Sequence, residues 1–401
     1  MANSYGRQPV PHFSLAERDQ RWAKVRALMA VDRLDLIFVP PNTGFFDWYQ
    51  SNVRYLTGIG GNCALAAAVF PMEGEPTAIT SPDIHASFWL GTQDWTKDIR
   101  TITSGWGFAL QAVERIKETP LRHRRIGISG LSGNTRFPEG TVSVGFVDEL
   151  RRAFPDVELV NANLLLERAR FVKSEEEISF IKQSVALVEE ALDVLAVEAR
   201  PGVPENVVYS RMLGRMTESG SDIPTLLLWS AGNPQPPSNH YMPTRRPLER
   251  DDIITFEIEA RWGGYRGQNT WQAVLGKVDD AYREMFDRQQ VAVQRCYDLL
   301  RPGKRVGELS EACQALSDDK YNCRIILHGM GLGDDSPICV YQPRDEIMRD
   351  WVLEENTVVI IKPVITTLDG SKRVYWGDSV RPTPSGAQRL GIRSPEIMQL
   401  C

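Results

Sequence analysis

The chain has 401 residues, of which 46 are Lys or Arg and 52 are Asp or Glu, so its formal net charge is −6. Apolar residues make up 42% and charged residues 24%, a composition typical of a globular chain long enough for two domains. The mild acidity argues against a nucleic-acid-binding protein, which would present a basic surface. We therefore expect no nucleic-acid partner.

Neither a membrane segment nor a secretory leader is expected. The longest apolar run, residues 63–70, is far shorter than the roughly 20 residues of a membrane span. The first 20 residues contain no apolar core of the kind that a signal peptide has. The six cysteines form no Cys-x-x-Cys pair, which favours free thiols in a reducing compartment. We expect a cytoplasmic protein.

The first part of the chain alternates helix-like and strand-like segments. Ser14 precedes an amphipathic stretch and Glu17 follows three residues on, which predicts a capped helix over 14–29. The apolar segment 34–39, stopped by two prolines, predicts a buried strand. An apolar run follows at 64–70, another strand is expected at 126–128, and a helix at 145–154. This alternation predicts an α/β domain over residues 1–165.

The best-signalled helix of the chain begins the second domain, residues 166–401. Ser174 and Glu177 form a capping-box pattern. An apolar stripe with steps of three and four residues follows, made of Ile178, Ile181, Val185, Val188, Leu192 and Leu195. The pattern predicts a long helix that ends at Arg200-Pro-Gly202.

This domain contains a weak internal repeat. A helix ending at 200–202 is followed by another helix, and the same arrangement recurs about 100 residues later at 301–303. The strand segments 252–257 and 357–362 repeat as well. Two such helix–helix–strand units would pack as pseudo-twofold halves with a cleft between their sheets.

The equivalent strand positions carry opposite charges, Glu257 and Lys362. A charged side chain within an apolar strand is costly unless it is paired or functional. This pair is therefore the first site candidate.

Five segments, in order along the chain, resemble the methionine aminopeptidase/prolidase/creatinase superfamily. They are an N-domain strand at 52–58, the junction helix at 170–178, the bend Gly264-Tyr265, the turn His328-Gly-Met-Gly331 and the closing strand and turn at 378–386. The resemblance implies an α/β N-terminal domain and an α+β C-terminal pita-bread domain with an internal pseudo-twofold repeat.

The metallopeptidases of this superfamily hold two metal ions with two Asp, one His and two Glu. By the resemblance, these ligands fall on Glu257, Gln268 or Asn269, His328, Lys362 and Gly377. One acid and one histidine remain, whereas hard divalent cations need several anionic oxygens. Lys362 would also repel a metal ion. We therefore expect neither a metal nor another cofactor.

Resemblance to the metal-free members, creatinase and ectoine hydrolase, suggests catalytic roles. The run Phe256-Glu-Ile258 resembles the ectoine hydrolase segment that carries a nucleophilic glutamate, so Glu257 is the candidate nucleophile or base. His240 lies in a segment that resembles the one supplying creatinase's catalytic histidine. Creatinase's substrate-binding glutamate is unmatched, and Thr270 lies near its place. Asp334 resembles the catalytic base of a dimethylsulfoniopropionate lyase of this fold.

The residues themselves suggest further roles. Glu257 and Glu259 alternate on one strand and share a face, where two acids would raise one another's pKa and allow proton transfer with His240. His328 precedes two glycines, which let a ligand approach the backbone. Lys362 is expected to bind a substrate carboxylate or an oxyanion.

Other residues are expected to bind the substrate. Gln268 stands in the same stretch as the second metal-ligand position. The aromatic residues Trp262, Tyr265, Tyr375 and Trp376 are candidates to line the pocket and stack on a cationic group, with core packing as the alternative.

Together these features predict a metal-independent, creatinase-like hydrolase that cleaves a non-peptide C–N bond in a small polar amidine, guanidine or amide. The alternatives are a lyase of the dimethylsulfoniopropionate type, an Xaa-Pro peptidase-like metalloenzyme and a non-catalytic binding protein. The family's homodimers further imply that the N-terminal domain, through residues 45–49, contributes to the neighbouring subunit's site.

Overall fold

The computed structural model describes residues 10–41, 50–61, 65–81, 83–102, 107–132, 139–224, 227–233, 242–343 and 345–400. The chain divides into two compact units, Met1–Phe171 with Leu332–Asp334 and Val172–Gly331 with Asp335–Cys401. The domain boundary predicted at residue 165 falls inside helix α6 (Asn163–Phe171). This helix packs on α1 (Leu15–Val31), and the Tyr55 hydroxyl donates to the Ala169 carbonyl at 2.9 Å. These contacts keep the whole of α6 in the first unit.

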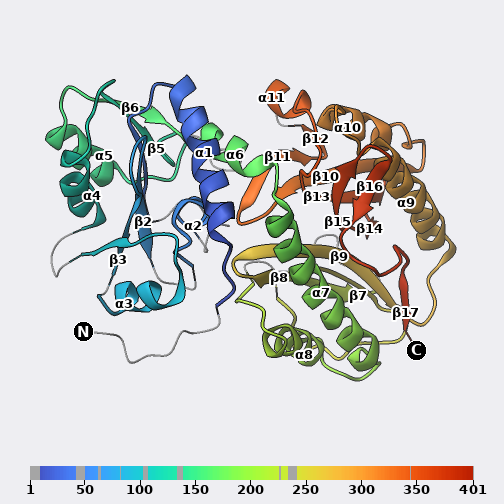
Figure 1. Cartoon of the computed structure of the whole chain (residues 1–401). Coiled ribbons are helices and arrows are strands. Elements are labelled where there is room, and N and C mark those ends of the chain that lie inside the picture. The colour runs from blue at the N-terminus through green and yellow to red at the C-terminus, as the bar shows by residue number, and fades with distance from the viewer. Residues whose placement is uncertain are drawn as a thin grey trace. The chain divides into compact units, whose positions relative to one another are not determined.

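The first unit is built on one mixed sheet (Figure 1). Its strand order is β4-β3-β2-β1-β5-β6 among the residues described. The strands are β1 (Leu36–Val39), β2 (Ala66–Pro71), β3 (Thr77–Thr80), β4 (Asp98–Thr101), β5 (Arg125–Ile128) and β6 (Glu158–Asn161). The remaining helices are α2 (Ser51–Thr57), α3 (Asp83–Thr92), α4 (Phe108–Lys117) and α5 (Val144–Ala153). The predicted alternation of helices and strands is confirmed.

One predicted strand of this unit is a helix. Residues 52–58, expected to form a strand, lie in α2 and its C-cap. The Thr57 hydroxyl donates to the Val53 carbonyl at 2.7 Å, and Gly58 ends the helix in the left-handed conformation, with φ 72°. The β-branched and aromatic residues of this segment favour a strand, but tertiary packing overrides so weak a preference.

The long helix α7 (Glu175–Glu198) opens the second unit as predicted. Ser174 accepts a hydrogen bond from the backbone N–H of Glu177, whose carboxylate accepts one from the Ser174 N–H, so the capping box is present. All six residues of the predicted apolar stripe are buried. This stripe packs α7 on α8 (Glu205–Glu218) and on strands β8 (Ile253–Trp262) and β9 (Tyr265–Leu275).

The second unit contains two sheets. One has the order β17-β9-β8-β7 and the other β12-β11-β10-β13-β15-β16, with β14 paired to β13. The other strands are β7 (Leu227–Gly232), β10 (Tyr321–Met330), β11 (Asp334–Val340), β12 (Gln342–Pro343), β13 (Val359–Thr367), β14 (Arg373–Tyr375), β15 (Asp378–Thr383), β16 (Gly386–Arg389) and β17 (Met398–Leu400). The other helices are α9 (Asp280–Leu299), α10 (Val306–Gln314) and α11 (Glu346–Arg349). The repeated strands expected from the sequence fall in β8 and β13, one in each sheet.

Each of these two strands has one apolar and one polar-bearing face. In β8, Phe256 and Ile258 join the core with α7 and α8, whereas Glu257 and Glu259 alternate with them and lie on the opposite face. In β13, Ile361 packs in the core formed with α9 and α10, and Lys362 lies on the other face. The helices therefore cover the apolar faces, and the polar faces carry the candidate site.

No helix in the described part of the chain is long and apolar enough to cross a lipid bilayer.

Candidate functional site

Five polar side chains from five strands of the second unit meet around Glu257. They are Glu257 (β8), Gln268 (β9), His328 (β10), Lys362 (β13) and Tyr375 (β14), and together they are called the Glu257 centre below. Each of the five is no more than 6% exposed. The centre joins residues that lie more than 100 positions apart in the sequence, including the oppositely charged pair Glu257 and Lys362 predicted from the repeat.

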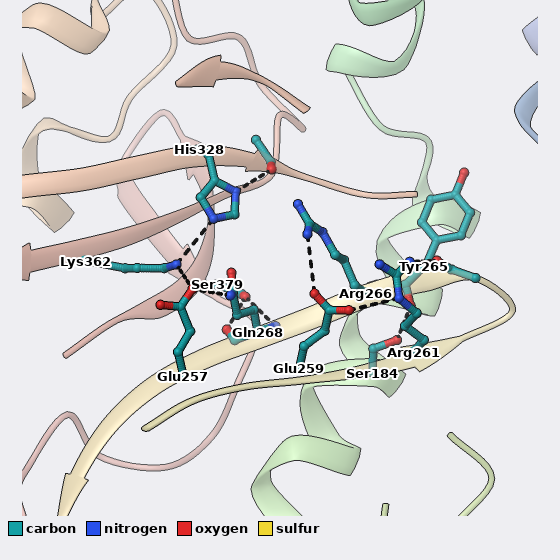
Figure 2. Close-up of polar contacts among 12 residues, drawn as sticks. Ser184, Glu257, Glu259, Arg261, Tyr265, Arg266, Gln268, His328, Lys362 and Ser379 are labelled. Atoms are coloured by element: carbon teal, nitrogen blue, oxygen red, sulfur yellow. Dashed lines mark hydrogen bonds and ion pairs between the residues drawn. The ribbon is translucent and has the colours of Figure 1, made fainter. Parts of the chain in front are cut away.

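The Glu257 carboxylate accepts hydrogen bonds from three side chains. Its Oε1 atom accepts from the Lys362 ammonium group and from the Gln268 amide, the latter at 2.5 Å (Figure 2). Its Oε2 atom accepts from the Tyr375 hydroxyl at 2.8 Å. A buried carboxylate is stable only when it is paired and hydrogen-bonded in this way. The arrangement fixes the carboxylate with a proton donor on each oxygen.

His328 is held as a neutral acceptor toward Lys362. Its Nδ1 atom lies 3.0 Å from the Gly329 carbonyl oxygen, which can only accept, so Nδ1 carries the hydrogen. The Nε2 atom therefore presents a lone pair to Lys362 Nζ, 3.3 Å away (Figure 2). The lysine ammonium group thus donates to both a carboxylate and an imidazole.

Tyr375 enters the centre as a proton donor. Burial, together with the charge of Glu257, raises the pKa of its hydroxyl well above the ordinary value of 10. The backbone N–H of Tyr375 donates to the Gln272 amide oxygen at 2.7 Å, which fixes the residue beside β9. Near neutral pH the hydroxyl therefore stays protonated and donates to Glu257.

The absence of a side chain at Gly377 leaves space for the side chain of Lys362. Thr270 and Gly377 exchange two backbone hydrogen bonds, of 3.2 and 2.8 Å, which tie β9 to the residue just before β15. A Cβ atom added at Gly377 would lie 2.6 Å from Lys362 Cγ and 3.0 Å from the Ile361 carbonyl oxygen. A side chain at position 377 is therefore incompatible with the observed path of Lys362.

Glu259 belongs to a second charged group, with Arg261 and Arg266. Its Oε1 atom accepts from Arg261 Nε at 2.9 Å, and its Oε2 atom accepts from Arg266 Nη1 at 3.4 Å (Figure 2). All three residues are at most 1% exposed, and burial lowers the pKa of Arg266. The register places Glu257 and Glu259 on one face, but each carboxylate has its own cations. The two acids were expected to act on one another's pKa; the structure instead gives each carboxylate its own cationic partner.

Three of the four aromatic residues expected to line the pocket point elsewhere. The Tyr265 hydroxyl donates to Glu177 on α7 at 2.7 Å. Trp376 packs edge-to-face on Trp271, with ring centroids 5.4 Å apart, in the core shared with α7 and α8, and Trp262 packs against the same core. The period of two along β8 turns Trp262 to the helix side, away from Glu257. Of the four predicted aromatics, Tyr375 is the one whose polar atom reaches the centre.

Two predicted catalytic residues cannot be placed. His240 lies in 234–241, outside the described residues, and the side chain of Asp334 is not described either. The next residue, Asp335, is buried and forms an ion pair with Lys173 at 3.3 Å. The doubled Asp of this loop indicated an acid here, but the sequence did not distinguish the two.

Sequence reasoning missed two supporting residues. The Ser379 hydroxyl donates to the Gln268 carbonyl at 2.8 Å and so steadies the strand that carries the amide (Figure 2). Arg266 forms half of the clamp on Glu259. Ser379 lies in the segment 378–386, which resembles the closing strand and turn of the family. The sequence therefore indicated that this segment matters, but it did not predict the hydrogen bond of Ser379.

The sequence of the chain matches the models of two known protein families. Residues 179–384, just over half of the chain, match the model of metallopeptidase family M24. The chain belongs to this family. Residues 21–172 match the creatinase/prolidase N-terminal domain. The two matches together confirm the predicted superfamily and its two-part architecture.

Relatives and solved structures agree with this assignment. The Xaa-Pro dipeptidase of Pyrococcus horikoshii is 22% identical over 382 residues, which cover 95% of this chain and 99% of the relative. The dimethylsulfoniopropionate lyase of Roseovarius nubinhibens is 24% identical over 58% of this chain and 54% of its own. An X-Pro aminopeptidase structure from Thermotoga maritima superposes with a TM-score of 0.77 at 18% identity, covering 94% of this chain and 99% of that one. The structural likeness confirms the pita-bread fold.

These comparisons correct the predicted activity. The sequence was interpreted as a metal-independent, creatinase-like hydrolase of non-peptide C–N bonds. The relatives matched over most of the chain are Xaa-Pro dipeptidases, whose name specifies a peptide bond. The creatinase-like, non-peptide activity was predicted from short segments around Glu257 and His240, which carried less information than the similarity of the whole chain.

The family name implies a metal ion, but the residues of the Glu257 centre do not fit one. In the described ranges, no three His, Cys, Asp or Glu side chains are grouped so as to hold a metal. Glu257 and His328 are ligand types, yet both accept hydrogen bonds from the Lys362 ammonium group. Divalent cations need several anionic oxygens. No step of the chemistry below is therefore assigned to a metal.

Proposed function

We propose that this protein acts on short peptides of the Xaa-Pro class and that the Glu257 centre is where the peptide bond is bound and cleaved. The relatives named Xaa-Pro dipeptidases support the substrate class. The observation that carries the proposal is the contact of a lysine ammonium group with both a carboxylate and a neutral imidazole on a buried polar face. Such a cluster combines a cation with two proton acceptors.

The chemistry follows from the three groups. Lys362 is a cation that can donate to the peptide carbonyl oxygen as negative charge develops on it. Glu257 is the acceptor for the proton of an attacking water molecule. The water oxygen adds to the carbonyl carbon, the C–N bond breaks, and the proline nitrogen leaves with the proton. His328 holds the ammonium group in position through its Nε2 lone pair.

The centre also has an acceptor atom available for a substrate. Gln268 Oε1 is buried and has no hydrogen-bond partner among the described residues. A buried polar atom without a partner is uncommon and calls for an explanation, such as a ligand. Gln268 lies on the inner face of β9, opposite Glu259 in the register. Its amide oxygen can accept a hydrogen bond from the N-terminal ammonium group of a peptide.

The test is proline release from a panel of Xaa-Pro dipeptides, measured by mass spectrometry. We expect Glu257→Gln and Lys362→Met each to lower kcat/KM by about 100-fold or more, because each removes a group from the reacting cluster. Exposed partners of the same types, Glu311→Gln and Lys320→Met, are matched controls expected to stay near wild type. Release that is insensitive to Glu257→Gln would refute the assignment of the site.

A second candidate function is peptide binding without turnover. It is favoured by the three donors already bonded to Glu257, because they occupy most of the acceptor sites of the carboxylate and lower its tendency to take a proton from water. In that case a dipeptide raises the melting temperature of the protein, and Lys362→Met abolishes the rise, while no proline appears. Proline release by the wild type rules this candidate out.

Location and assembly remain proposals. We propose a cytoplasmic protein, supported by the free thiols Cys296, Cys313, Cys323 and Cys339. A homodimer in which the N-terminal domain completes the neighbouring site is also proposed; residues 45–49, expected to contribute, lie outside the described residues. Light scattering of the purified protein tests the dimer, and a monomer at micromolar concentration would exclude it.

A further inference from the structure

The Glu257 centre contains a cation that is part of the chain. Lys362 Nζ forms an ion pair with Glu257 and lies 3.3 Å from His328 Nε2. A carboxylate oxygen and an imidazole lone pair directed at one positive centre are the donors that a metal ion attracts. Here the positive centre is an ammonium nitrogen, only 2% exposed as a residue.

The charge of the centre is already balanced. One carboxylate faces one ammonium group, and the other members, His328, Gln268 and Tyr375, are held as neutral groups by the contacts described above. Adding a divalent ion would give these five buried side chains a net charge of +2, which is strongly unfavourable.

The position of the Lys362 side chain depends on the absence of a side chain at Gly377. The lysine Cγ atom occupies the space that a Cβ atom at position 377 would need, with a separation of 2.6 Å. The Ile361 carbonyl oxygen, 3.0 Å from the same point, closes the other side. Backbone hydrogen bonds to Thr270 prevent this segment from moving away. Lys362 and the missing side chain at 377 are therefore one coupled feature.

We infer that the Lys362 ammonium group is the resident cation of this centre and takes the place of the metal ion that the name of the metallopeptidase family implies. The absence of a side chain at Gly377 leaves the space that the Lys362 side chain occupies. The inference concerns the centre of the proposed peptide activity but does not depend on the substrate. Its tests measure ion binding and stability, whereas the peptide proposal is tested by proline release, so the two can fail separately.

The first test titrates chelator-treated protein with Mn²⁺ and with Zn²⁺ by calorimetry. We expect no stoichiometric binding in the wild type that depends on His328. The variant Lys362→Glu exchanges the cation for a second carboxylate beside Glu257 and His328 and should bind at least tenfold more tightly, with the gain lost on adding His328→Gln. One equivalent of either ion bound by the wild type and lost in His328→Gln would overturn the inference, as would a folded Lys362→Glu variant without the gain.

A second test needs no metal-binding variant to fold. Gly377→Ala should destabilise the protein because its Cβ atom meets Lys362 Cγ, and Lys362→Ala in the same chain should relieve that clash. The melting temperature of the double variant should therefore lie above the value expected from adding the two single losses. Gly214→Ala in α8, where a Cβ atom meets nothing within 4 Å, is the matched control. Simple additivity of the two losses would refute the coupling.

Discussion

Glu257 and Glu259 stand two residues apart on one strand and face the same way, yet their surroundings differ in one decisive property. Glu259 accepts from Arg261 and Arg266, whose guanidinium groups do not give up protons near neutral pH. Glu257 accepts from a lysine, an amide and a phenol, and a histidine adjoins the lysine.

The difference separates a structural ion cluster from a reactive one. The guanidinium groups of Arg261 and Arg266 hold the Glu259 carboxylate through directed hydrogen bonds from planar forks. A lysine can move its donors between neighbours, because its ammonium group rotates on a flexible stem. Burial alone therefore does not identify a catalytic carboxylate; the kind of cation beside it does.

The largest expected effect comes from breaking the arginine clamp. Glu259→Gln leaves Arg261 and Arg266 buried without the carboxylate between them, and we expect it to lower the free energy of unfolding by about 3–5 kcal/mol. Urea denaturation followed by circular dichroism measures the loss. Glu311→Gln, on the exposed face of α10, should change stability by no more than about 0.5 kcal/mol. A loss below about 1 kcal/mol for Glu259→Gln would show that the clamp is not structural.

Lys362→Met is expected to have a smaller effect on stability. It removes the cation from Glu257, but Gln268 and Tyr375 still donate to the carboxylate, so we expect a loss of about 2–3 kcal/mol. Adding Glu257→Gln removes the uncompensated charge and should restore part of that loss. The coupling energy from the double-mutant cycle, expected at about 1–3 kcal/mol, measures the pair. Zero coupling would mean that the ion pair is not formed in solution.

The sequence predicted the Glu257–Lys362 pair for a physical reason. Each charge stood in an apolar strand, and a buried charge requires a partner. The period of two along a strand also placed Glu257 and Glu259 on one face. The cations of Glu259 were not foreseen, because Arg266 is brought to it by the register of the β8–β9 hairpin, a pairing that short-range patterns did not specify.

Residues outside regular patterns were harder to predict. The period of two along β8 turns Trp262 toward the helices, whereas it was expected in the pocket because an aromatic ring can stack on a cationic group. Residues 52–58 had strand-like composition and became a helix, because preferences of a few tenths of a kcal/mol per residue give way to packing. The steric role of Gly377 was not predicted, because the contact between positions 377 and 362 appears only when Gly377 is placed beside Ile361 and Lys362 of β13.

The smallest expected loss of stability comes from removing the Tyr375 hydroxyl, which donates to Glu257 alongside Lys362. Tyr375→Phe removes one neutral hydrogen bond to a charged group, so we expect a loss of about 1–2 kcal/mol at pH 7. The folded pKa of Tyr375 is raised, mainly by burial, so its contribution is complete below the unfolded value of about 10 and is lost as pH rises above it. The wild type should therefore lose stability above pH 10 more steeply than Tyr375→Phe, with Tyr341→Phe as the control. Parallel slopes in urea denaturation between pH 9 and 11 would show that the phenol titrates as it does in the unfolded chain, and Glu257 would then depend on Lys362 and Gln268 alone.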